Sequence, residues 1–515
     1  MLPKRGPHHV TVDHAELEPF EPLLSGLMHI AFTSGISSLG SVGFKMADIY
    51  QKDKARRRFI RGCHYGYDKA QQRIGAQVID LEAKIVAAEH EAKQFRRGRD
   101  ARVKQVLDRI RVLKNRQLVL RRIMDGILWV IIAPDTWILR RLGEDQIRRI
   151  DPTVLRRTTA LASARNRESR YRFNVVADLT TLVHIGDLVE VIILPRARKR
   201  WRVIEIKEGK MNETISGLLK DKEQPFSRPE LEQIRLSLGD HAAKQARRMM
   251  AQESRMSELA RIIETDRGRD FSLKMEIWMT PESVELEQYF EPLAGVVDRT
   301  HEAGIAGAVI DQCLRLVGIK SELIDKTGGL GAVAHVFFHL ANPEHGCKLS
   351  DTEEAKAEVK AFALLPPIID LVGHNMRCQW GTPIPIWPMN PSRVTDLLMG
   401  RIRLFAQFDI EAFFKLVEAS GLRVRWVVGK EAEELRKISR PIPGSPNALG
   451  ARVEHPDGFV QKLASGFFAR VISDLTSPRF LLTAIKRAPE QLARMKEIES
   501  GEISPARDIQ QSVSE

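Results

Sequence analysis

Apolar residues recur at three- and four-residue steps between about residue 68 and residue 122, which is the spacing of one face of an α-helix. The positions are Val78, Leu81, Ile85 and Ala88, then Val103, Val106, Ile110 and Leu113. Gly98 interrupts the pattern within the charged stretch RRGRD, so we expect two helices packed as an antiparallel hairpin or a short coiled coil. The run RRIMDGILWVII, which begins at Arg121, predicts a buried helix.

Short apolar runs separated by turn residues predict strands in the middle of the chain. Such runs extend from Leu188 to Leu194 and from Trp201 to Ile206, and a basic turn joins them, so we expect a β-hairpin. The sequence Ser-Arg-Pro-Glu at residues 227–230 has the serine cap and early proline of a helix start. A further strand is expected from Ser272 to Met279.

Beyond about residue 280 the pattern alternates between helices and short strands. The clearest strand candidates are Val333 to Leu340, Leu422 to Val428 and Ala451 to Glu454. The whole pattern predicts a mixed α+β protein, and 515 residues are too many for one ordinary core. We expect a loosely ordered basic N-terminal segment (1–65), a helical hairpin or coiled-coil arm (66–120), an α/β domain (121–290), an α+β domain (291–488) and a polar tail (489–515).

Composition narrows the class of protein. Hydrophobic residues make up 43% of the chain and charged residues 29%, which is typical of a globular protein. The four cysteines stand far apart without a CxxC pair, so the sequence indicates neither a zinc knuckle nor a disulfide framework and fits a reducing cytoplasm. Acidic residues near the start disfavour a signal peptide, and no apolar run approaches the ~20 residues of a membrane-spanning helix. We therefore expect a cytoplasmic protein without a membrane segment.

The net charge of +13 points to a polyanionic partner, because neutralising phosphates releases counterions and drives association. Basic residues are densest at 54–61, 96–99 and 196–200. The third cluster forms the predicted hairpin turn and would contact nucleic acid through Arg196, Arg198, Lys199 and Arg200. The alternative is that such loops only keep the protein in solution.

One face of the predicted hairpin carries the residues of a metal site. Side chains alternate between faces along a strand, so Val203, Glu205 and Lys207 share one face. If the two strands pair as neighbours, Asp187, Glu205 and Lys207 converge on one point. Two carboxylates suit Mg²⁺ (or Mn²⁺), which prefers oxygen ligands and leaves positions for substrate phosphate oxygens. The lysine would lie beside the attacking water, in the outline of a phosphodiester hydrolysis site.

Glu-x-Lys by itself is a weak signal, because the sequence contains several other copies. They begin at Glu82, Glu91, Glu208, Glu354 and Glu358. Most of these lie in charged, helical-looking stretches, whereas Glu205 ends an apolar strand. A carboxylate and an ammonium buried in a hairpin are costly without a partner or a metal. A structural ion pair between Lys207 and either Asp187 or Glu205 would also meet this requirement, so both interpretations stay open.

The order of Gly186-Asp187, apolar strand, basic turn and Val203-Ile204-Glu205-Ile206-Lys207 resembles the PD-(D/E)XK superfamily, the restriction-endonuclease-like nucleases. The resemblance covers roughly residues 120–290 and includes the wording DLT and IGD of an uncharacterised bacterial branch. It implies a restriction-endonuclease-like core with a central mixed sheet flanked by helices. It also implies that Asp187, Glu205 and the Ile206 carbonyl bind the metal and that Lys207 positions the water.

The resemblance implies further site residues on the following helix. Some branches carry a glutamine there, and Gln245 occurs at a suitable place, with Arg247 and Arg248 nearby to meet phosphate. A solvated helix face explains these polar residues equally well.

Other members of the site are implied around the first strand. Asp178 and His184 would line the site, although a helix cap and a buried imidazole are ordinary alternatives. The family often places a glutamate on the helix before the first strand, where the candidates are Glu144 and Glu168.

Two functions follow as hypotheses. The first is a Mg²⁺-dependent nuclease acting on DNA, with a role in bacterial antiviral defence suggested only by the habits of the family. The second is a non-catalytic module that binds nucleic acid or protein on a degenerate nuclease fold. In either case the helical arm offers a surface for a homodimer or a protein partner.

Overall fold

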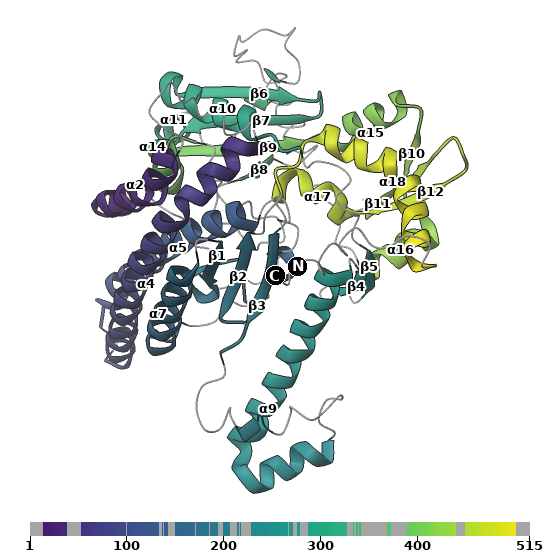
Figure 1. Ribbon diagram of the computed structural model, residues 1–515. Helices are drawn as coiled ribbons and strands as arrows, with labels where there is room; N and C mark the ends of the chain where they lie inside the picture. The colour runs from purple at the N-terminus through teal and green to yellow at the C-terminus, as the bar shows by residue number, and fades with distance from the viewer. Residues whose placement is uncertain are drawn as a thin grey trace.

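The chain forms long helices and small antiparallel sheets (Figure 1). The computed structural model describes residues 14–38, 53–98, 100–132, 136, 139–142, 150–169, 171–184, 186–193, 199–206, 214–215, 217, 228–265, 267–270, 275–278, 287–326, 333, 336–337, 339–340, 368–371, 389–438 and 449–500. Helices and strands are mixed along these residues, which confirms the α+β class.

Three helices build the N-terminal part of the molecule. They are α2 (Glu21–Ser38), α4 (Asp53–Arg97) and α5 (Val103–Ile132), preceded by the short α1 (His14–Leu17) and η1 (Glu18–Phe20). α4 and α5 form the expected helical hairpin, and its break at Gly98 is confirmed. The Gly98 amide donates to the Gln94 carbonyl at 3.1 Å, just beyond the end of α4. A small apolar cluster holds the tip together: Ala88, Ala92, Val106 and Ile110.

The expectation that residues 1–65 are loosely ordered is wrong for most of that segment, because residues 14–38 and the start of α4 are helical. α2 buries Met28 and Phe32 in the main core, beside α4. A glycine of α4 lets the two helices approach closely. An ideal Cβ on Gly66 would lie 2.3 Å from the Ile30 carbonyl oxygen, closer than a side chain can come.

The second half of α5 lies in the core. Every residue from Val119 to Ile132 is buried, as expected for this run. The ring of Trp129 meets that of Phe290 edge to face, with the centroids 5.1 Å apart, so α5 connects to α10 (Phe290–Ala303) in the C-terminal part. The domain boundary expected at residue 121 therefore falls inside a continuous helix that belongs to one large core.

The predicted hairpin forms part of a three-stranded antiparallel sheet. The strands are β1 (Arg172–Val176), β2 (Leu188–Ile193) and β3 (Lys199–Ile204), in the order β1-β2-β3. Leu188 pairs with both Ile204 and Val176, which sets the register of the two strand pairs. α7 (Pro152–Glu168) begins after the capping carboxylate of Asp151 and packs against β1.

Side chains of α4 satisfy the outer edge of β1. The amide nitrogen of Gln71 donates to the Asn174 carbonyl at 3.0 Å, and its oxygen accepts from the Val176 amide at 2.9 Å. Two turns earlier, the imidazole of His64 contacts the Arg172 carbonyl at 2.6 Å. One carboxamide thus takes the place of a neighbouring strand, so β1 does not expose a row of backbone groups for pairing with another chain.

A long kinked helix projects from the rest of the molecule (Figure 1). α9 (Arg228–Thr265) begins as predicted after Ser227 and changes direction at Gly239, where φ is 88° and ψ is 169°. It packs against β4 (Arg267–Asp270), which pairs with β5 (Met275–Trp278). β5 confirms the centre of the strand expected from Ser272 to Met279.

Two more antiparallel sheets occupy the C-terminal part. The first has the order β6-β7-β9-β8, from β6 (Ile305–Ile310), β7 (Leu314–Lys320), β8 (Ile368–Asp370) and β9 (Ile402–Phe408). The second has the order β10-β11-β12, from β10 (Arg423–Trp426), β11 (Gly450–Glu454) and β12 (Val460–Ala464). The remaining helices are α6 (Leu139–Leu142), α11 (Ser321–Lys326), α14 (Pro391–Leu398), α15 (Ile410–Ala419), α16 (Gly429–Ile438), α17 (Ser465–Ser473) and α18 (Pro478–Glu499).

Some expectations for this part are confirmed and others are wrong. β10 and β11 confirm the strands expected at 422–428 and 451–454. α18 extends to Glu499, so the tail expected from residue 489 begins inside a helix. The described residues of the strand expected at 333–340 are helical, because Val333, Phe337 and Leu340 have helical spacing and pack on one apolar cluster. Every strand pair among the described residues is antiparallel, so they do not form the expected mixed sheet.

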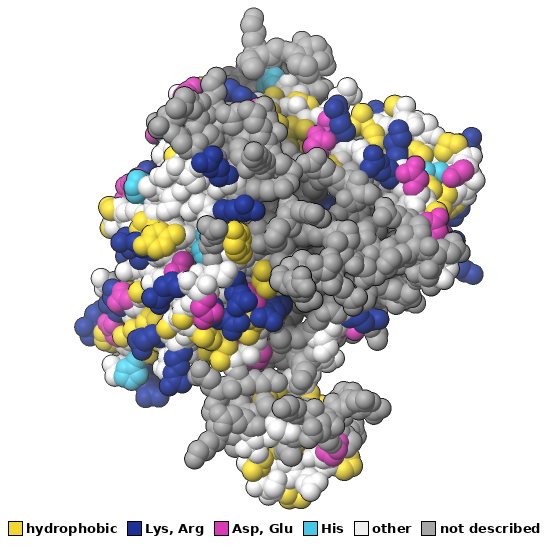
Figure 2. Space-filling model, viewed as in Figure 1, with side chains coloured by type: hydrophobic (Ala, Val, Ile, Leu, Met, Phe, Trp, Pro, Cys, Tyr) yellow, Lys and Arg dark blue, Asp and Glu magenta, His cyan; other side chains and the backbone are white. Residues whose placement is uncertain are grey.

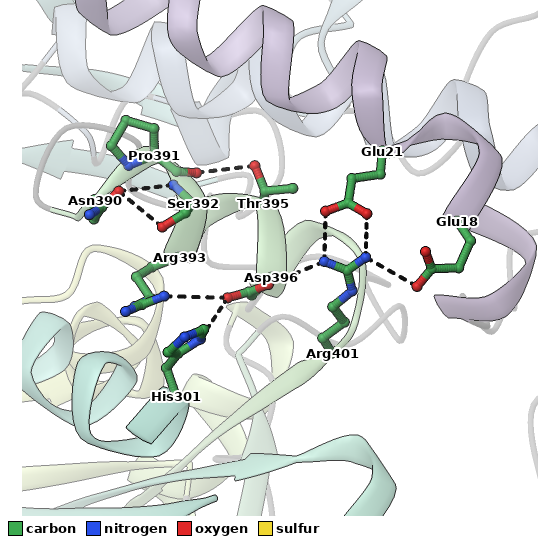
Figure 3. Close-up of polar contacts among 10 residues, drawn as sticks. All are labelled: Glu18, Glu21, His301, Asn390, Pro391, Ser392, Arg393, Thr395, Asp396 and Arg401. Atoms are coloured by element: carbon green, nitrogen blue, oxygen red, sulfur yellow. Dashed lines mark hydrogen bonds and ion pairs between the residues drawn. The ribbon is translucent and has the colours of Figure 1, made fainter. Parts of the chain in front are cut away.

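A charged cluster ties the N-terminal helices to the C-terminal part (Figure 3). Arg401 forms ion pairs with Glu18 and Glu21 at the start of the N-terminal helices, and its Nη1 lies 3.5 Å from Asp396 of α14. Asp396 also lies 3.1 Å from Nδ1 of His301 on α10. The Arg401 guanidinium lowers the pKa of Glu21 from its ordinary value through a hydrogen bond. Two acids from one part and one from the other therefore share a single arginine.

The close crossing of α2 and α4 can be tested by replacing a glycine at the crossing with alanine. Tight packing and helix propensity predict opposite effects of this substitution on stability. Replacing glycine by alanine in an exposed helix usually stabilises it by about 1 kcal/mol. Gly66→Ala should instead lower the apparent melting temperature, at a cost of about 1–3 kcal/mol, because the new methyl group meets the Ile30 carbonyl. Gly26→Ala in α2 is the control, since its Cβ would meet nothing within 4 Å and should raise the melting temperature. Equal effects of the two substitutions in thermal unfolding would contradict this packing.

Candidate functional site

The end of the β2–β3 hairpin brings Asp187 beside Glu205. The Asp187 amide donates to the Ile204 carbonyl at 2.8 Å, and its Oδ2 accepts from the Ile206 amide at 2.5 Å. Asp187 is thus bonded to the residues on both sides of Glu205. Both acidic side chains are half-buried, and the Ala177 amide donates to the Asp187 carbonyl at 2.9 Å from the end of β1. The structure therefore places the two predicted acids at adjoining strand ends.

Gly186 makes this arrangement possible. Its φ of +72° lies in the left-handed region, which residues other than glycine rarely adopt. An ideal Cβ at this position would lie 2.2 Å from Cγ1 of Val203, so the chain passes too close to β3 for any side chain. The glycine before the predicted aspartate therefore sets how closely Asp187 approaches the second strand.

A buried polar network supports the segment that leads from β1 to Asp187. The segment starts with η3 (Ala177–Leu179) and continues through Thr180 and Thr181. Asp125 of α5 accepts from the Thr181 amide at 2.7 Å and from its hydroxyl at 2.5 Å. Arg121, one turn earlier, donates to the Thr180 carbonyl. The DLT motif is therefore fixed by α5.

Burial controls the titration of this network. Removal from water raises the pKa of Asp125 to about 6, and the hydrogen bonds from Thr181 and the charges of Arg121 and Arg122 offset only part of that effect. Desolvation likewise lowers the pKa of Arg121, against the charges of Asp125 and Asp178. Asp178 is half-buried in η3 and lies within the electrostatic reach of α5.

Several predicted site residues lie outside the described residues. These are Lys207, Glu144, Arg196 and Arg198. Lys199 and Arg200 belong to β3, and Arg248 to α9, but only their backbone is described. The lysine and most of the basic turn therefore stay predictions.

The candidate residues that follow the hairpin in sequence lie on α9. Gln245 and Arg247 lie on α9, where the neighbouring Ala242 and Ala246 pack on Ile215 in an apolar cluster separate from the main core. Figure 1 shows α9 leading away from the β1–β3 sheet. On this helix Gln245 is half-buried and Arg247 is exposed.

The structure also describes the positions of the candidate acid Glu168 and of His184. Glu168 ends α7, and its Oε2 lies 4.0 Å from Nη1 of Arg172, at the end of β1 that pairs with Ile192. Asp187 lies at the opposite end of the sheet, roughly five residues or about 16 Å along the strand. His184 donates its backbone amide to the Leu142 carbonyl at 2.7 Å. Glu168 therefore does not complete a site with Asp187.

The donor chemistry at the strand ends is compatible with one divalent cation bound by few protein ligands. Carboxylate oxygens are the ligands that Mg²⁺ prefers, and it usually takes one or two of them while keeping waters or phosphate oxygens. Within the described part of the chain, no group of three or more His, Cys, Asp or Glu side chains is arranged to hold a metal ion. Asp187 and Glu205 alone would therefore supply two side-chain ligands at most.

Sequence reasoning missed two polar clusters. One is the Asp125 network, and the other surrounds Glu190 on β2, which is fully buried at 0% exposure. Arg202 Nε donates to Glu190 Oε2 at 2.6 Å, and Arg165 and Arg172 lie nearby. The sequence did contain a signal for the second cluster. A glutamate inside the apolar run LVEVII requires buried partners, because an unpaired buried charge is costly.

No protein-family model, curated protein or solved structure matches this chain. Among the described helices, none is both long and apolar enough to cross a membrane.

Substitution of Gly186 tests whether the tight turn positions Asp187. Gly186→Ala should destabilise the protein by about 2 kcal/mol or more, because it adds left-handed strain to a clash with Val203. Gly458→Ala is the matched control: its φ is +86°, but its Cβ would meet nothing within 4 Å. Thermal unfolding should show the larger loss for Gly186→Ala, and equal losses would mean that the approach to β3 does not matter.

The raised pKa of Asp125 predicts a specific pH dependence. A group whose pKa is higher in the folded state stabilises the fold most below its unfolded pKa of 3.8, and this contribution is lost as the pH rises to about 6. The contribution should fall by about 1.4 kcal/mol per pH unit within this window, or roughly 3 kcal/mol in all. Asp125→Asn cannot titrate, so the melting temperature of the native protein minus that of the variant should decrease from pH 4 to pH 6 and then level off. A constant difference would show that the pKa is not raised.

Proposed function

We propose that this protein hydrolyses phosphodiester bonds of DNA, with a divalent cation bound at the end of the β2–β3 hairpin. The observation that supports the proposal is that Asp187 hydrogen-bonds to the residues on both sides of Glu205. These bonds make the backbones of the two acids neighbours, in a chain with a net charge of +13. The resemblance to the PD-(D/E)XK nucleases assigns this chemistry to the same pair of acids.

Each residue has a separate task in this proposal. Asp187 and Glu205 would hold Mg²⁺ or Mn²⁺, together with the Ile206 carbonyl. When bound, the cation supplies positive charge that lowers the pKa of water and neutralises charge developing on the phosphate. Lys207 would orient the attacking water through its ammonium group. Gly186 keeps the first acid close to β3, and α5 holds the end of the DLT motif through Arg121 and the next residue, Thr181, through Asp125.

A role in antiviral defence would follow if the DNA were foreign, and it rests on the family resemblance alone. A cytoplasmic location would suit such a role.

A non-catalytic nucleic-acid- or protein-binding module is the second candidate. The observation that favours it is that Asp187 Oδ2 already accepts the Ile206 amide, which is the role of a carboxylate that caps the end of a strand pair. A binder would show salt-sensitive association with an oligonucleotide and no cleavage with Mg²⁺ or Mn²⁺.

Conversion of Glu205 to glutamine separates the two candidates. Glu205→Gln keeps the size of the side chain but removes the charge that binds the cation. Cleavage of a labelled plasmid with Mg²⁺ should fall by at least ~100-fold, the scale expected when an electrostatic contributor to the transition state is lost. Binding of Mn²⁺, followed by electron paramagnetic resonance, should weaken in the same variant. Oligonucleotide affinity in EDTA should stay the same or rise, because without a cation the acid only repels the phosphate backbone.

Asp80→Asn provides the control, because Asp80 is an exposed acid of α4 that pairs only with Lys84 one turn away in the described structure. It should leave both cleavage and Mn²⁺ binding unchanged. Full activity of Glu205→Gln, or a native protein that is inert with both cations, would overturn the nuclease proposal.

A further inference from the structure

Three arginines surround one buried carboxylate on β2. Glu190 is 0% exposed, Arg202 Nε donates to its Oε2 at 2.6 Å, and Arg165 Nη2 donates to its Oε1 at 3.3 Å. Arg172 Nε lies 3.4 Å from the same Oε1. The arginines come from β3, α7 and β1, so the fold itself assembles the cluster. A buried carboxylate needs such partners, because an unpaired buried charge is costly.

The cluster holds more positive charge than Glu190 requires. Arg202 and Arg172 approach Glu190 through Nε, while 58% and 33% of their side-chain surfaces stay exposed. A guanidinium bonded through Nε retains two terminal NH2 groups, whose fork matches a phosphate. Glu168 lies 4.0 Å from Arg172 and is largely exposed, so among the residues that the structure describes three arginines face two acids. One positive charge is left over on side chains that are already held in place.

α4 extends the positive charge from this point. His64 contacts the Arg172 carbonyl at 2.6 Å, and the next residue, Tyr65, is 61% exposed. The Lys69 ammonium lies 4.3 Å from the centroid of the Tyr65 ring. The exposed side chains of α4 between residues 58 and 76 are Arg58, Arg61, Tyr65, Lys69, Gln72, Arg73 and Ala76. None of these is acidic.

The basic side chains of this stripe are not neutralised within the described structure. Arg58, Arg61, Lys69 and Arg73 form no ion pair with a carboxylate of the described residues. Sixteen residues of helix, from Arg58 to Arg73, span about 22 Å, over which one strand of a duplex presents about six phosphates. An exposed aromatic ring beside such charges is a surface on which a base can stack. Figure 2 shows many Lys and Arg side chains, interspersed with acidic and hydrophobic ones, over the part of the molecule where α4, α7 and the β1–β3 sheet lie.

We propose that these residues form a metal-independent binding surface for the phosphodiester backbone of nucleic acid. This α4–β3 basic surface consists of Arg58, Arg61, Lys69, Arg73, Arg172 and Arg202. It is separate from the acids at the strand ends, which would repel phosphate in the absence of a cation. That the polyanion is a nucleic acid rests on the proposed function. The surplus of positive charge follows from the contacts of the arginines and is independent of that function.

The test measures binding of the full-length protein to a short labelled single-stranded DNA in EDTA, by fluorescence anisotropy at several salt concentrations. Arg202→Gln should weaken binding roughly three- to tenfold and reduce the slope of log affinity against log salt by about 0.7, the value for one lost phosphate contact. The double variant Arg61→Gln/Lys69→Gln should reduce the slope by about twice as much. Arg165 and Arg172 still face Glu190 in Arg202→Gln, and its melting curve checks that it is folded.

Arg425→Gln is the matched control. Arg425 is a strand residue of β10 that is 66% exposed and lies 3.4 Å from Glu454, so it resembles Arg202 in exposure and pairing. It should bind DNA like the native protein. Arg202→Lys, which keeps the charge but loses the fork, should recover most of the salt slope.

The outcomes separate this inference from the proposed function. Unchanged binding in both surface variants, or an equal loss in Arg425→Gln, overturns the basic surface even if Mg²⁺-dependent cleavage is present. Failure of the native protein to bind DNA also overturns it. Selective loss in the surface variants supports the surface, and it does so equally when the protein cleaves nothing, in which case the nuclease proposal alone fails.

Discussion

The docking of α4 on the edge of β1 is the contact on which the candidate site depends. A two-stranded hairpin such as β2–β3 is marginal by itself and needs a third strand or a packed helix to be stable. Gln71 supplies both a donor and an acceptor to β1, and His64 satisfies a further carbonyl of the same edge. β1 in turn fixes β2, and β2 fixes β3. The spacing of Asp187 and Glu205 is therefore set by a helix that contributes no residue to the proposed chemistry.

Buried charges locate the sheet within the molecule as much as apolar packing does. Asp125 of α5 hydrogen-bonds to the segment between β1 and β2. Glu190 contacts arginines from α7, β1 and β3. Removing one partner from such a buried group is more costly than the pair is worth, because the remaining charge has no water to replace it. The network therefore restricts how the hairpin can shift, which favours a fixed geometry at its end.

Sequence patterns predicted the elements whose causes are local. The β2–β3 hairpin and the break at Gly98 follow from residues within a few positions of each other, and so did the closeness of Asp187 and Glu205. Other features depend on residues far apart in the chain. Gly66 packs against Ile30, and the segment after the DLT motif hydrogen-bonds to Asp125. Both partners lie far away in the sequence, so a pattern of neighbouring residues does not reveal these contacts. Gln245 was assigned to the site through the family resemblance, and the direction of the helix that carries it changes at Gly239, which no local pattern predicted.

Electrostatics explains why binding and cleavage would occupy different parts of the same sheet. Two carboxylates at the strand ends repel a phosphodiester, so the proposed site of Asp187 and Glu205 would gain affinity for its substrate through a bound cation. The guanidinium groups held on Glu190 and the basic stripe of α4 attract the backbone without one. Attraction of this kind acts over about a Debye length and weakens with salt, whereas cation binding by the acids depends on short contacts. A chain built in this way would bind nucleic acid first and react with it only where the backbone reaches the hairpin end.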